Sequence, residues 1–309
     1  MTQHIAPLER STIVLCGASS GFGRGAALEL GRRGARLVLM ARRQAALADL
    51  AGAINAAGGQ AIATAGDISR AGDVAAVAAA AVEGFGGFDI WINNVGIGAL
   101  GLFWDIPVED QARVIDVNLK GLMFGAHAAM RQFRAQGHGV LVNVGSIDSE
   151  VPIAYQTTYA ATKAAVLSLG RSLNAELRLA GLGDRIRVGT VMPWAVDTPW
   201  WNHAANYTGH APRMAAMDDP SLVVDAILRA CTDPQEEMPV GPKARAANLS
   251  HRLFPDLTER LSSTVAHREV QKADPLAPTA GAIYTPSTAP ADIGGGVRAR
   301  MRAEDADRT

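Results

Sequence analysis

The stretch that decides the fold is residues 13–23, which read Ile-Val-Leu-Cys-Gly-Ala-Ser-Ser-Gly-Phe-Gly. Three apolar residues, typical of a buried strand, lead directly into a turn with glycines at positions 17, 21 and 23. The stretch from Phe22 to Arg33 then predicts a helix that ends at Gly34. Glycines between a strand and a helix let the backbone and the helix N-terminus approach a diphosphate. We therefore expect a phosphate-binding loop here, the alternative being an ordinary tight turn.

The same alternation of short apolar runs and Ala-rich helical stretches continues along the chain. Further strands are predicted at residues 37–40, 61–65, 90–92, 140–144 and 187–192, and helices at 42–57, 69–84, 108–136, 159–180 and 221–231. Residues 238–240 can form only a short edge strand, because Pro239 has no N–H to donate. Repeated strand–helix units predict an α/β fold: a doubly wound, Rossmann-like parallel sheet with helices on both faces.

One domain with a C-terminal extension is expected. Residues 1–242 form the Rossmann-like dinucleotide-binding and catalytic domain, within which 193–220, rich in Trp, Pro and Asn, is the expected substrate lid. Residues 243–309 form the extension, and its last part, 273–309, is rich in Pro, Gly and Ala, which predicts a poorly ordered or surface-lying tail. Residues 250–267 carry four apolar side chains near helical spacing. This helix could pack on the body, meet another subunit or lie on a membrane surface.

Composition excludes several classes of protein. With 48% hydrophobic residues in 309, the chain can bury a large core. The 29 basic and 30 acidic residues leave a net charge of −1, which gives no footprint for nucleic acid or for an anionic membrane surface. Scattered histidines and only two cysteines, Cys16 and Cys231, predict neither a metal site nor a disulfide scaffold. We expect a cytoplasmic protein without a nucleic-acid partner, for which membrane binding is the least favoured alternative.

Chemistry is concentrated in two segments. Tyr159 and Lys163 are four residues apart and share one face of a helix, so the ammonium should lie near the phenol. A nearby cation favours the phenolate and lowers the pKa of the tyrosine from its ordinary value of about 10, which makes proton exchange possible near neutral pH. Ser146 follows the fifth strand, at the edge of the sheet where the carboxyl ends of strands line a ligand crevice.

Two arginines end the second strand. Folds that bind NAD usually place an acidic residue near this point to hold the ribose 2′-OH. Arg42 and Arg43 would instead suit a 2′-phosphate through charge-assisted hydrogen bonds. The alternative is that both are solvated residues at the start of a helix.

Together these residues resemble the short-chain dehydrogenase/reductase family of the Ser-Tyr-Lys-Asn tetrad type, over roughly Ser11 to Pro242. The glycine turn is similar to that family's cofactor loop, and Asn93-Asn94-Val95-Gly96 is similar to its Asn-Asn-Ala-Gly stretch. The matches to its catalytic tetrad are Asn118, Ser146, Tyr159 and Lys163.

The resemblance implies hydride exchange between NADP(H) and a ketone or aldehyde and the matching alcohol. Tyr159 would give or take the proton, and Ser146 would orient the carbonyl oxygen. Lys163 would bind the nicotinamide ribose and lower the pKa of Tyr159, and Asn118 would hold a water that links Lys163 to solvent.

A cofactor-binding set follows from the same resemblance. Its members are Gly17, Ser19, Ser20, Gly21, Phe22, Gly23, Arg42, Arg43, Asp67, Ile68, Asn94, Val95, Gly96, Tyr159, Lys163, Pro193 and Thr198. In it Asp67 would hold the adenine amino group and Thr198 the nicotinamide carboxamide, while Arg42 with Ser19 favours NADP(H) over NAD(H). The chain departs from the family pattern at Cys16, Val95 and Trp194, where Thr, Ala and Gly are usual.

Substrate contacts are expected from Ser146, Tyr155, Trp194 and Trp200. Four of the five tryptophans, at positions 104, 194, 200 and 201, lie on segments that line the pocket in such folds, as do Val151 and His203. This favours a bulky apolar or aromatic carbonyl substrate. Alternatively, Trp200 and Trp201 close the lid onto the core.

Assembly and two competing functions complete the expectations. The helices at 108–136 and 159–180 resemble the family's interface helices, which predicts a homodimer or homotetramer. A non-catalytic NADP(H)-binding redox sensor or interaction protein is the main alternative, although it would have no need of the Ser–Tyr pair. Epimerase or dehydratase chemistry would need further acid/base groups, and the segment 150–160 offers none beyond Glu150.

Overall fold

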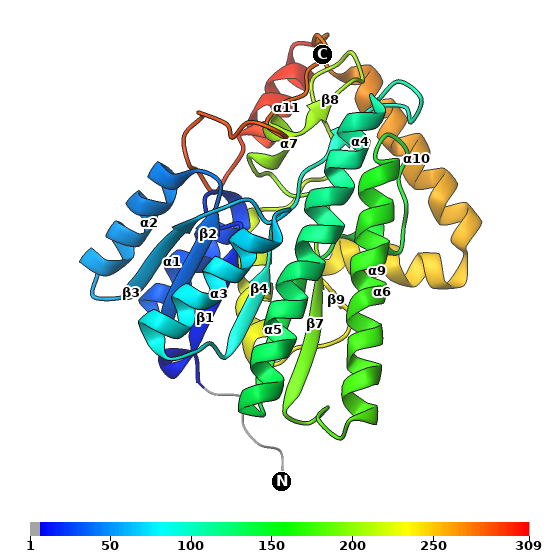
Figure 1. Cartoon of the computed structure of the whole chain (residues 1–309). Helices are drawn as coiled ribbons and strands as arrows, with labels where there is room; N and C mark the ends of the chain where they lie inside the picture. Colours follow the sequence, from blue (N-terminus) through cyan, green and yellow to red (C-terminus); the bar gives the residue numbers. More distant parts are fainter. Residues whose placement is uncertain (1–6, 309) are drawn as a thin grey trace.

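A computed structural model describes residues 7–308. Its main sheet is parallel, with the strand order β3-β2-β1-β4-β6-β7-β9 (Figure 1). The strands are β1 (Thr12–Cys16), β2 (Arg36–Ala41), β3 (Gln60–Ala65), β4 (Ile90–Asn93), β6 (Gly139–Val144), β7 (Ile186–Met192) and β9 (Met238–Pro239). The order reverses between β1 and β4, and this switch point opens a crevice at the carboxyl ends of the strands. The predicted Rossmann-like fold is confirmed.

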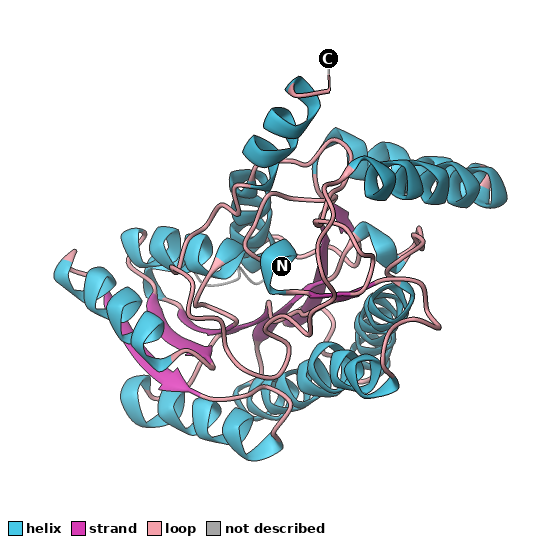
Figure 2. Cartoon of the chain, turned by 90° about the horizontal axis from the view of Figure 1, so that it is seen from above, coloured by secondary structure: helices cyan, strands magenta, loops and turns pink. Residues whose placement is uncertain are grey.

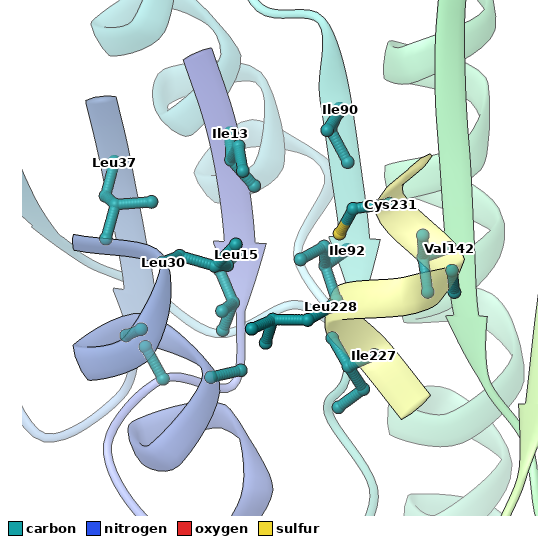
Figure 3. Close-up of a cluster of buried hydrophobic side chains, with 14 of the residues drawn as sticks. Ile13, Leu15, Leu30, Leu37, Ile90, Ile92, Val142, Ile227, Leu228 and Cys231 are labelled. Atoms are coloured by element: carbon teal, nitrogen blue, oxygen red, sulfur yellow. The ribbon is translucent and has the colours of Figure 1, made fainter. Parts of the chain in front are cut away.

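Helices cover both faces of the sheet (Figure 2). They are α1 (Gly21–Arg32), α2 (Gln44–Ala56), α3 (Ala71–Phe85), α5 (Leu122–Gln136), α6 (Thr157–Leu179) and α8 (Pro220–Thr232). Side chains alternate along β1: Ile13 and Leu15 pack with α1, α2 and α8, while Val14 packs on the opposite face with α3, α5 and α6. Figure 3 shows Ile13 and Leu15 in the first cluster with Leu30 of α1 and Ile227 of α8. Burial on both faces explains the uninterrupted apolar runs in the sequence.

The helix predicted at 108–136 is wrong in one respect, because it is three elements. A π-helical turn, η2 (Asp116–Gly121), separates α4 (Val108–Ile115) from α5. A π turn fits an extra residue into the helix and often marks a functional position. Here it carries the buried Asn118.

Short elements lie beyond the carboxyl edge of the main sheet. A second, two-stranded sheet pairs β5 (Ala99–Leu100) with β8 (Ala205–Asn206). The predicted lid segment contains α7 (Trp200–His203) and β8, so it is partly regular structure. The 3-10 turn η3 (Ile147–Ser149) also lies at this edge, whereas the 3-10 turn η1 (Leu8–Arg10) precedes β1 at the opposite, amino edge.

The C-terminal extension contains α9 (Gly241–Leu253), α10 (Pro255–Lys272) and α11 (Val297–Ala306), of which α10 lies at the periphery (Figure 1). The four apolar side chains of the predicted 250–267 helix are between 41% and 63% exposed, whereas Ala266 of the same helix is buried against the body with Trp201 and Met214. No helix within residues 7–308 has both the length and the apolar character that crossing a bilayer requires. The predicted tail lies on the surface and ends in α11.

Candidate active site

In the glycine loop between β1 and α1, backbone segments lie so close together that side chains would not fit between them. Gly17 and Gly21 have φ of +91° and +56°, in the left-handed region that favours glycine. A Cβ on Gly23 would lie 2.0 Å from the carbonyl oxygen of Gly17, so no other residue fits there. Asn94 ties the loop to the end of β4, since its Nδ2 donates to the same oxygen at 3.0 Å. The Oδ1 of Asn94 is buried and has no partner among the described residues.

A single pocket extends from this loop along the carboxyl edge of the sheet to Tyr159. Of the predicted residues it is lined by Gly17, Ser19, Ser20, Gly21, Phe22, Arg42, Arg43, Asp67, Ile68, Asn94, Val95, Gly96, Ser146, Tyr159, Lys163, Pro193, Trp194, Thr198 and Trp200. Trp201 and His203, expected on segments that line the pocket, also line it. The predicted residues that are not part of its lining are Gly23, Trp104, Asn118, Val151 and Tyr155. The glycine loop at the start of α1 and two cationic side chains on one wall fit a phosphate-bearing dinucleotide, and the unpartnered Asn94 Oδ1 can accept a hydrogen bond from its sugar or base.

Ser146, Tyr159 and Lys163 meet at one end of the pocket. The Ser146 hydroxyl hydrogen-bonds the phenol of Tyr159 and accepts from the backbone N–H of Asp148 at 3.1 Å. Lys163, one turn further along α6, places its Nζ 5.5 Å from the centre of the Tyr159 ring. The same Nζ donates to the carbonyl oxygen of Val144 at 2.8 Å. The i, i+4 spacing thus brings the ammonium to the tyrosine as expected.

The electrostatics of this end differ from the expectation in one respect. Burial raises the pKa of Tyr159, and the charge of Asp148 raises it further, while only the hydrogen bond to Ser146 lowers it. Burial also lowers the pKa of Lys163 to about 8. The predicted lowering of the Tyr159 pKa is therefore wrong, because desolvation of the buried phenol dominates.

The side chain of Asn118 hydrogen-bonds the backbone of the loop that follows β4. Its Oδ1 accepts from the N–H of Ile97, and its Nδ2 donates to the carbonyl of the same residue, both at 2.8 Å. A further bond joins Nδ2 to Thr162 Oγ1 on α6 at 3.2 Å. Asn118 therefore fixes the Gly96–Ile97 segment beside Lys163, whose Nζ would lie 3.4 Å from a Cβ on Gly96.

Asp148 is a titratable pocket residue that sequence reasoning missed. Its side chain is only 5% exposed and lines the pocket beside Tyr159 and Lys163. Burial raises its pKa to about 7, although the charge of Lys163 opposes the shift. Glu150, the residue considered for additional acid/base chemistry, instead pairs with Arg171 and does not line the pocket. The only signal for Asp148 was its position two residues after Ser146.

At the other end of the pocket, Arg42 and Arg43 are half-buried and form no ion pair with a carboxylate of residues 7–308. Burial lowers the pKa of both guanidiniums. Asp67, in contrast, is fully engaged: it accepts from Ser69 and pairs with Arg113 at 2.5 Å. Although burial alone would raise it, these bonds hold the pKa of Asp67 below its ordinary value. Arg113 was missed because nothing in a helical stretch marks it.

Tryptophans form much of the wall around the tyrosine. The ring of Trp200 lies 5.2 Å from that of Tyr159, and its indole packs where a Cβ on Gly98 would stand. Trp201 also lines the pocket and is buried in an apolar cluster against which Trp200 packs, so the pair serves both as pocket wall and as core. Trp194 lines the pocket, whereas Trp104 is 78% exposed and does not.

Tyr155 points to a different element. Its hydroxyl lies 2.6 Å from Nδ1 of His267 on α10, and the two rings stack. The residue has φ of +70°, an unusual conformation for a side chain with a Cβ. The structure thus places Tyr155 in the contact with the C-terminal extension and outside the pocket lining.

Residues 11–207 match the family model described as short chain dehydrogenase, which covers the glycine loop, Asn118, Ser146, Tyr159 and Lys163. The chain belongs to this family. As a short-chain dehydrogenase it is an oxidoreductase of the class that acts on CH–OH and C=O groups.

Two relatives and one solved structure show how far along the short-chain dehydrogenase the similarity extends. An uncharacterized oxidoreductase, YxnA, of Bacillus subtilis is 33% identical over 274 residues, covering 88% of this chain and 76% of its own. The L-rhamnose 1-dehydrogenase (NAD(P)(+)) of Azotobacter vinelandii is 38% identical over 192 residues, 60% of this chain and 73% of its own. A crystal structure of a short chain dehydrogenase/reductase from Burkholderia phymatum in complex with NAD has a TM-score of 0.71 at 25% identity and covers 87% of this chain and 97% of its own. This enzyme family binds a nicotinamide cofactor.

Proposed function

We propose that this short-chain dehydrogenase interconverts a ketone or aldehyde and the matching alcohol with NADP(H), and that Tyr159 is its general acid/base. The observation that carries the proposal is that Ser146, Tyr159 and Lys163 line the same pocket as the glycine loop. The dinucleotide, when bound, supplies or accepts the hydride. The protein's own part is to position the carbonyl and to move one proton.

Proton transfer follows from the surroundings of the phenol. Because burial raises its pKa, Tyr159 keeps its proton at neutral pH and can donate it to a carbonyl oxygen. Ser146, already hydrogen-bonded to the phenol, can donate to the same oxygen and orient it. With a pKa of about 8, Lys163 stays mostly protonated at pH 7 and stabilises negative charge that develops beside it.

Preference for NADP(H) is supported by the charges at the far end of the pocket. Arg42 and Arg43 carry positive charge that no carboxylate of residues 7–308 pairs with. A 2′-phosphate would accept charge-assisted hydrogen bonds from both.

Indole rings favour a bulky apolar or aromatic substrate. Trp194 and Trp200 line the pocket with Ile153 and Met214, so a large part of its wall near Tyr159 is apolar. Such a surface buries more apolar area, and so binds more tightly, when it covers a ring or a branched chain than when it covers a small polar molecule.

We also infer a homodimer or homotetramer in the cytoplasm. Support comes from the apolar side chains that α4 and α5 expose, among them Val108 and Met123, in the helices that resemble the family's interface. Both cysteines are free and buried, which is compatible with a reducing compartment. Light scattering behind a sizing column gives the number of subunits.

The first experiment follows nicotinamide absorbance with NADPH and with NADH across aliphatic, alicyclic, aryl and steroid ketones. Turnover with NADPH on bulky ketones supports the proposal. Tight NADPH binding without turnover in either direction would favour the redox sensor instead.

Tyr159→Phe separates catalysis from binding. Removal of the phenol hydroxyl deletes the proton donor but leaves the pocket shape, so kcat should fall by about 10²–10⁴-fold while the Kd for NADPH changes little. Unchanged turnover in this variant would contradict the assignment of Tyr159.

A further inference from the structure

Residues 282–292, hereafter the covering segment, lie far beyond the part of the chain that matches the family model. In Figure 1 this stretch runs above the carboxyl ends of β1 and β2. Three of its residues, Ala282, Pro286 and Ser287, line the pocket together with the glycine loop. It therefore forms a wall of the pocket that the family pattern does not contain.

The covering segment is bound to the two cationic side chains. Nη1 of Arg42 donates to the carbonyl oxygens of residues 283 and 284 at 3.0 and 2.8 Å, and Nη2 donates to that of residue 282 at 2.7 Å. Nη1 of Arg43 donates to the carbonyl oxygen of Ala289 at 2.9 Å. Carbonyls orient a guanidinium without cancelling its charge, and these bonds use three of the five N–H donors of Arg42. The remaining donors and the full positive charge are left for an anion.

Both ends of the covering segment are anchored to the body. At its start, Ile283 is fully buried in a cluster with Ile106 and Val114, and Arg113 Nε donates to its carbonyl oxygen at 3.0 Å. At its end, the N–H of Gly21 donates to the carbonyl oxygen of residue 292 at 2.9 Å. Gly21 opens α1, so the covering segment reaches the loop where a diphosphate would bind.

We propose that the covering segment is part of the dinucleotide site and closes over the adenosine half of NADP(H), with the 2′-phosphate held between Arg42, Arg43 and Ser287. This inference rests on the proposed function. Because the segment is attached at both ends, the dinucleotide enters and leaves only when the segment lifts. Loosening an anchor therefore speeds NADPH release without touching the groups that transfer the proton.

Hydrogen exchange on the wild-type chain tests the proposal without a variant. Amides of residues 282–292 are followed by mass spectrometry with and without saturating NADPH. We expect NADPH to slow their exchange at least as strongly as that of the glycine loop. Exchange at 282–292 that NADPH leaves unchanged, while the glycine loop is protected, would overturn the inference and leave the proposed function standing.

Ile283→Ser tests the first anchor, because it removes a buried apolar side chain that does not line the pocket. NADPH release, followed by nucleotide fluorescence after mixing with excess NADP⁺, should become about tenfold faster. Leu276→Ser is the matched control, since Leu276 lies in the same extension and is 43% exposed. Release at the wild-type rate from Ile283→Ser would contradict the proposal.

Gly295→Ala displaces the chain that follows the second anchor, three residues beyond residue 292, and serves if Ile283→Ser does not fold. A Cβ at 295 would lie 2.2 Å from the carbonyl oxygen of Thr198, so the chain just after the covering segment must shift. The adjacent Gly294→Ala is its control, because a Cβ at 294 meets nothing within 4 Å. We expect faster NADPH release only from Gly295→Ala. A wild-type chain that binds no dinucleotide would overturn the inference and the proposed function together.

Discussion

At the scale of single residues, burial shifts the pKa values of the pocket's titratable groups, raising that of Tyr159 and lowering that of Lys163. Tyr159 and Lys163 could be placed together because four residues make about one helical turn. The direction of the Tyr159 pKa could not be read in this way. It depends on how deeply the phenol is buried and on Asp148, and only the folded chain brings these together.

Asp148 makes the fold sensitive to pH. Burial raises its pKa from 3.8 to about 7, so the folded chain holds this proton more tightly than the unfolded chain does. The stability that this gives is fully present below pH 3.8 and is lost as the pH rises through about 7. Asp148→Asn cannot ionise and should be more stable than the wild type at pH 8, by on the order of 2–4 kcal/mol, with the gain fading toward pH 4. Urea unfolding across this pH range measures it, with the exposed Asp105→Asn as control. A gain that does not depend on pH would mean that Asp148 is not the titrating group.

In the proposed site, Arg42 decides between NADP(H) and NAD(H). Arg42→Asp replaces a donor for the 2′-phosphate by a carboxylate that repels it and can hold a ribose 2′-OH. The ratio of kcat/KM for NADPH to that for NADH should fall by about a hundredfold or more, an amount typical of losing charge-assisted hydrogen bonds. Arg245→Asp, an exposed change on α9, should leave the ratio unaltered.

At the scale of elements, the strands were predictable because both faces of the sheet are covered, which leaves uninterrupted apolar runs between glycines and polar turns. The π turn at 116–121 was not predictable. Its residues are as compatible with an α-helix as their neighbours, and the turn is fixed by the bonds that Asn118 makes to a distant loop.

Arg213 joins three elements that no local pattern links. Its guanidinium, in the predicted lid segment, pairs with Glu269 of α10 at 2.9 Å and with Glu304 of α11 at 2.7 Å, and all three side chains are buried. Arg213→Ala removes the buried partner of both carboxylates and leaves Glu269 with Lys272 and Glu304 with Arg300. It should lower the free energy of unfolding by about 3 kcal/mol, the low end of the range for breaking a buried pair. Arg298→Ala removes an exposed ion pair with Asp219 and should cost less than about 1 kcal/mol. Urea titrations of the two variants make the comparison, and equal losses would contradict it.

At the scale of the whole molecule, the role of the C-terminal extension was the least predictable part. Its contacts with the two arginines of the pocket are made by backbone carbonyl oxygens, and every residue type carries one of these. Composition could therefore indicate a surface-lying tail but not what it covers.

The predicted lid segment and the C-terminal extension share one apolar cluster, so we expect the chain to unfold as a single cooperative unit. Trp201 and Met214 of the lid segment pack with Ala266 of α10 and Val297 of α11. The predicted division at residue 242 should therefore not produce two separate transitions, and calorimetry should record one peak. A second, independent peak would mean that residues 243–309 fold on their own.

The two ends of the described chain have opposite surroundings, which matters to anyone who expresses this protein. The start, near Leu8, precedes β1 at the amino edge of the sheet, away from the pocket (Figure 1). The last helix, α11, begins on the carboxylate of Asp197, which accepts from the N–H of Val297 at 2.9 Å, next to the end of the pocket wall. An affinity tag or a fluorescent fusion belongs ahead of Leu8, because one attached behind α11 would pull on the segment that closes over the cofactor.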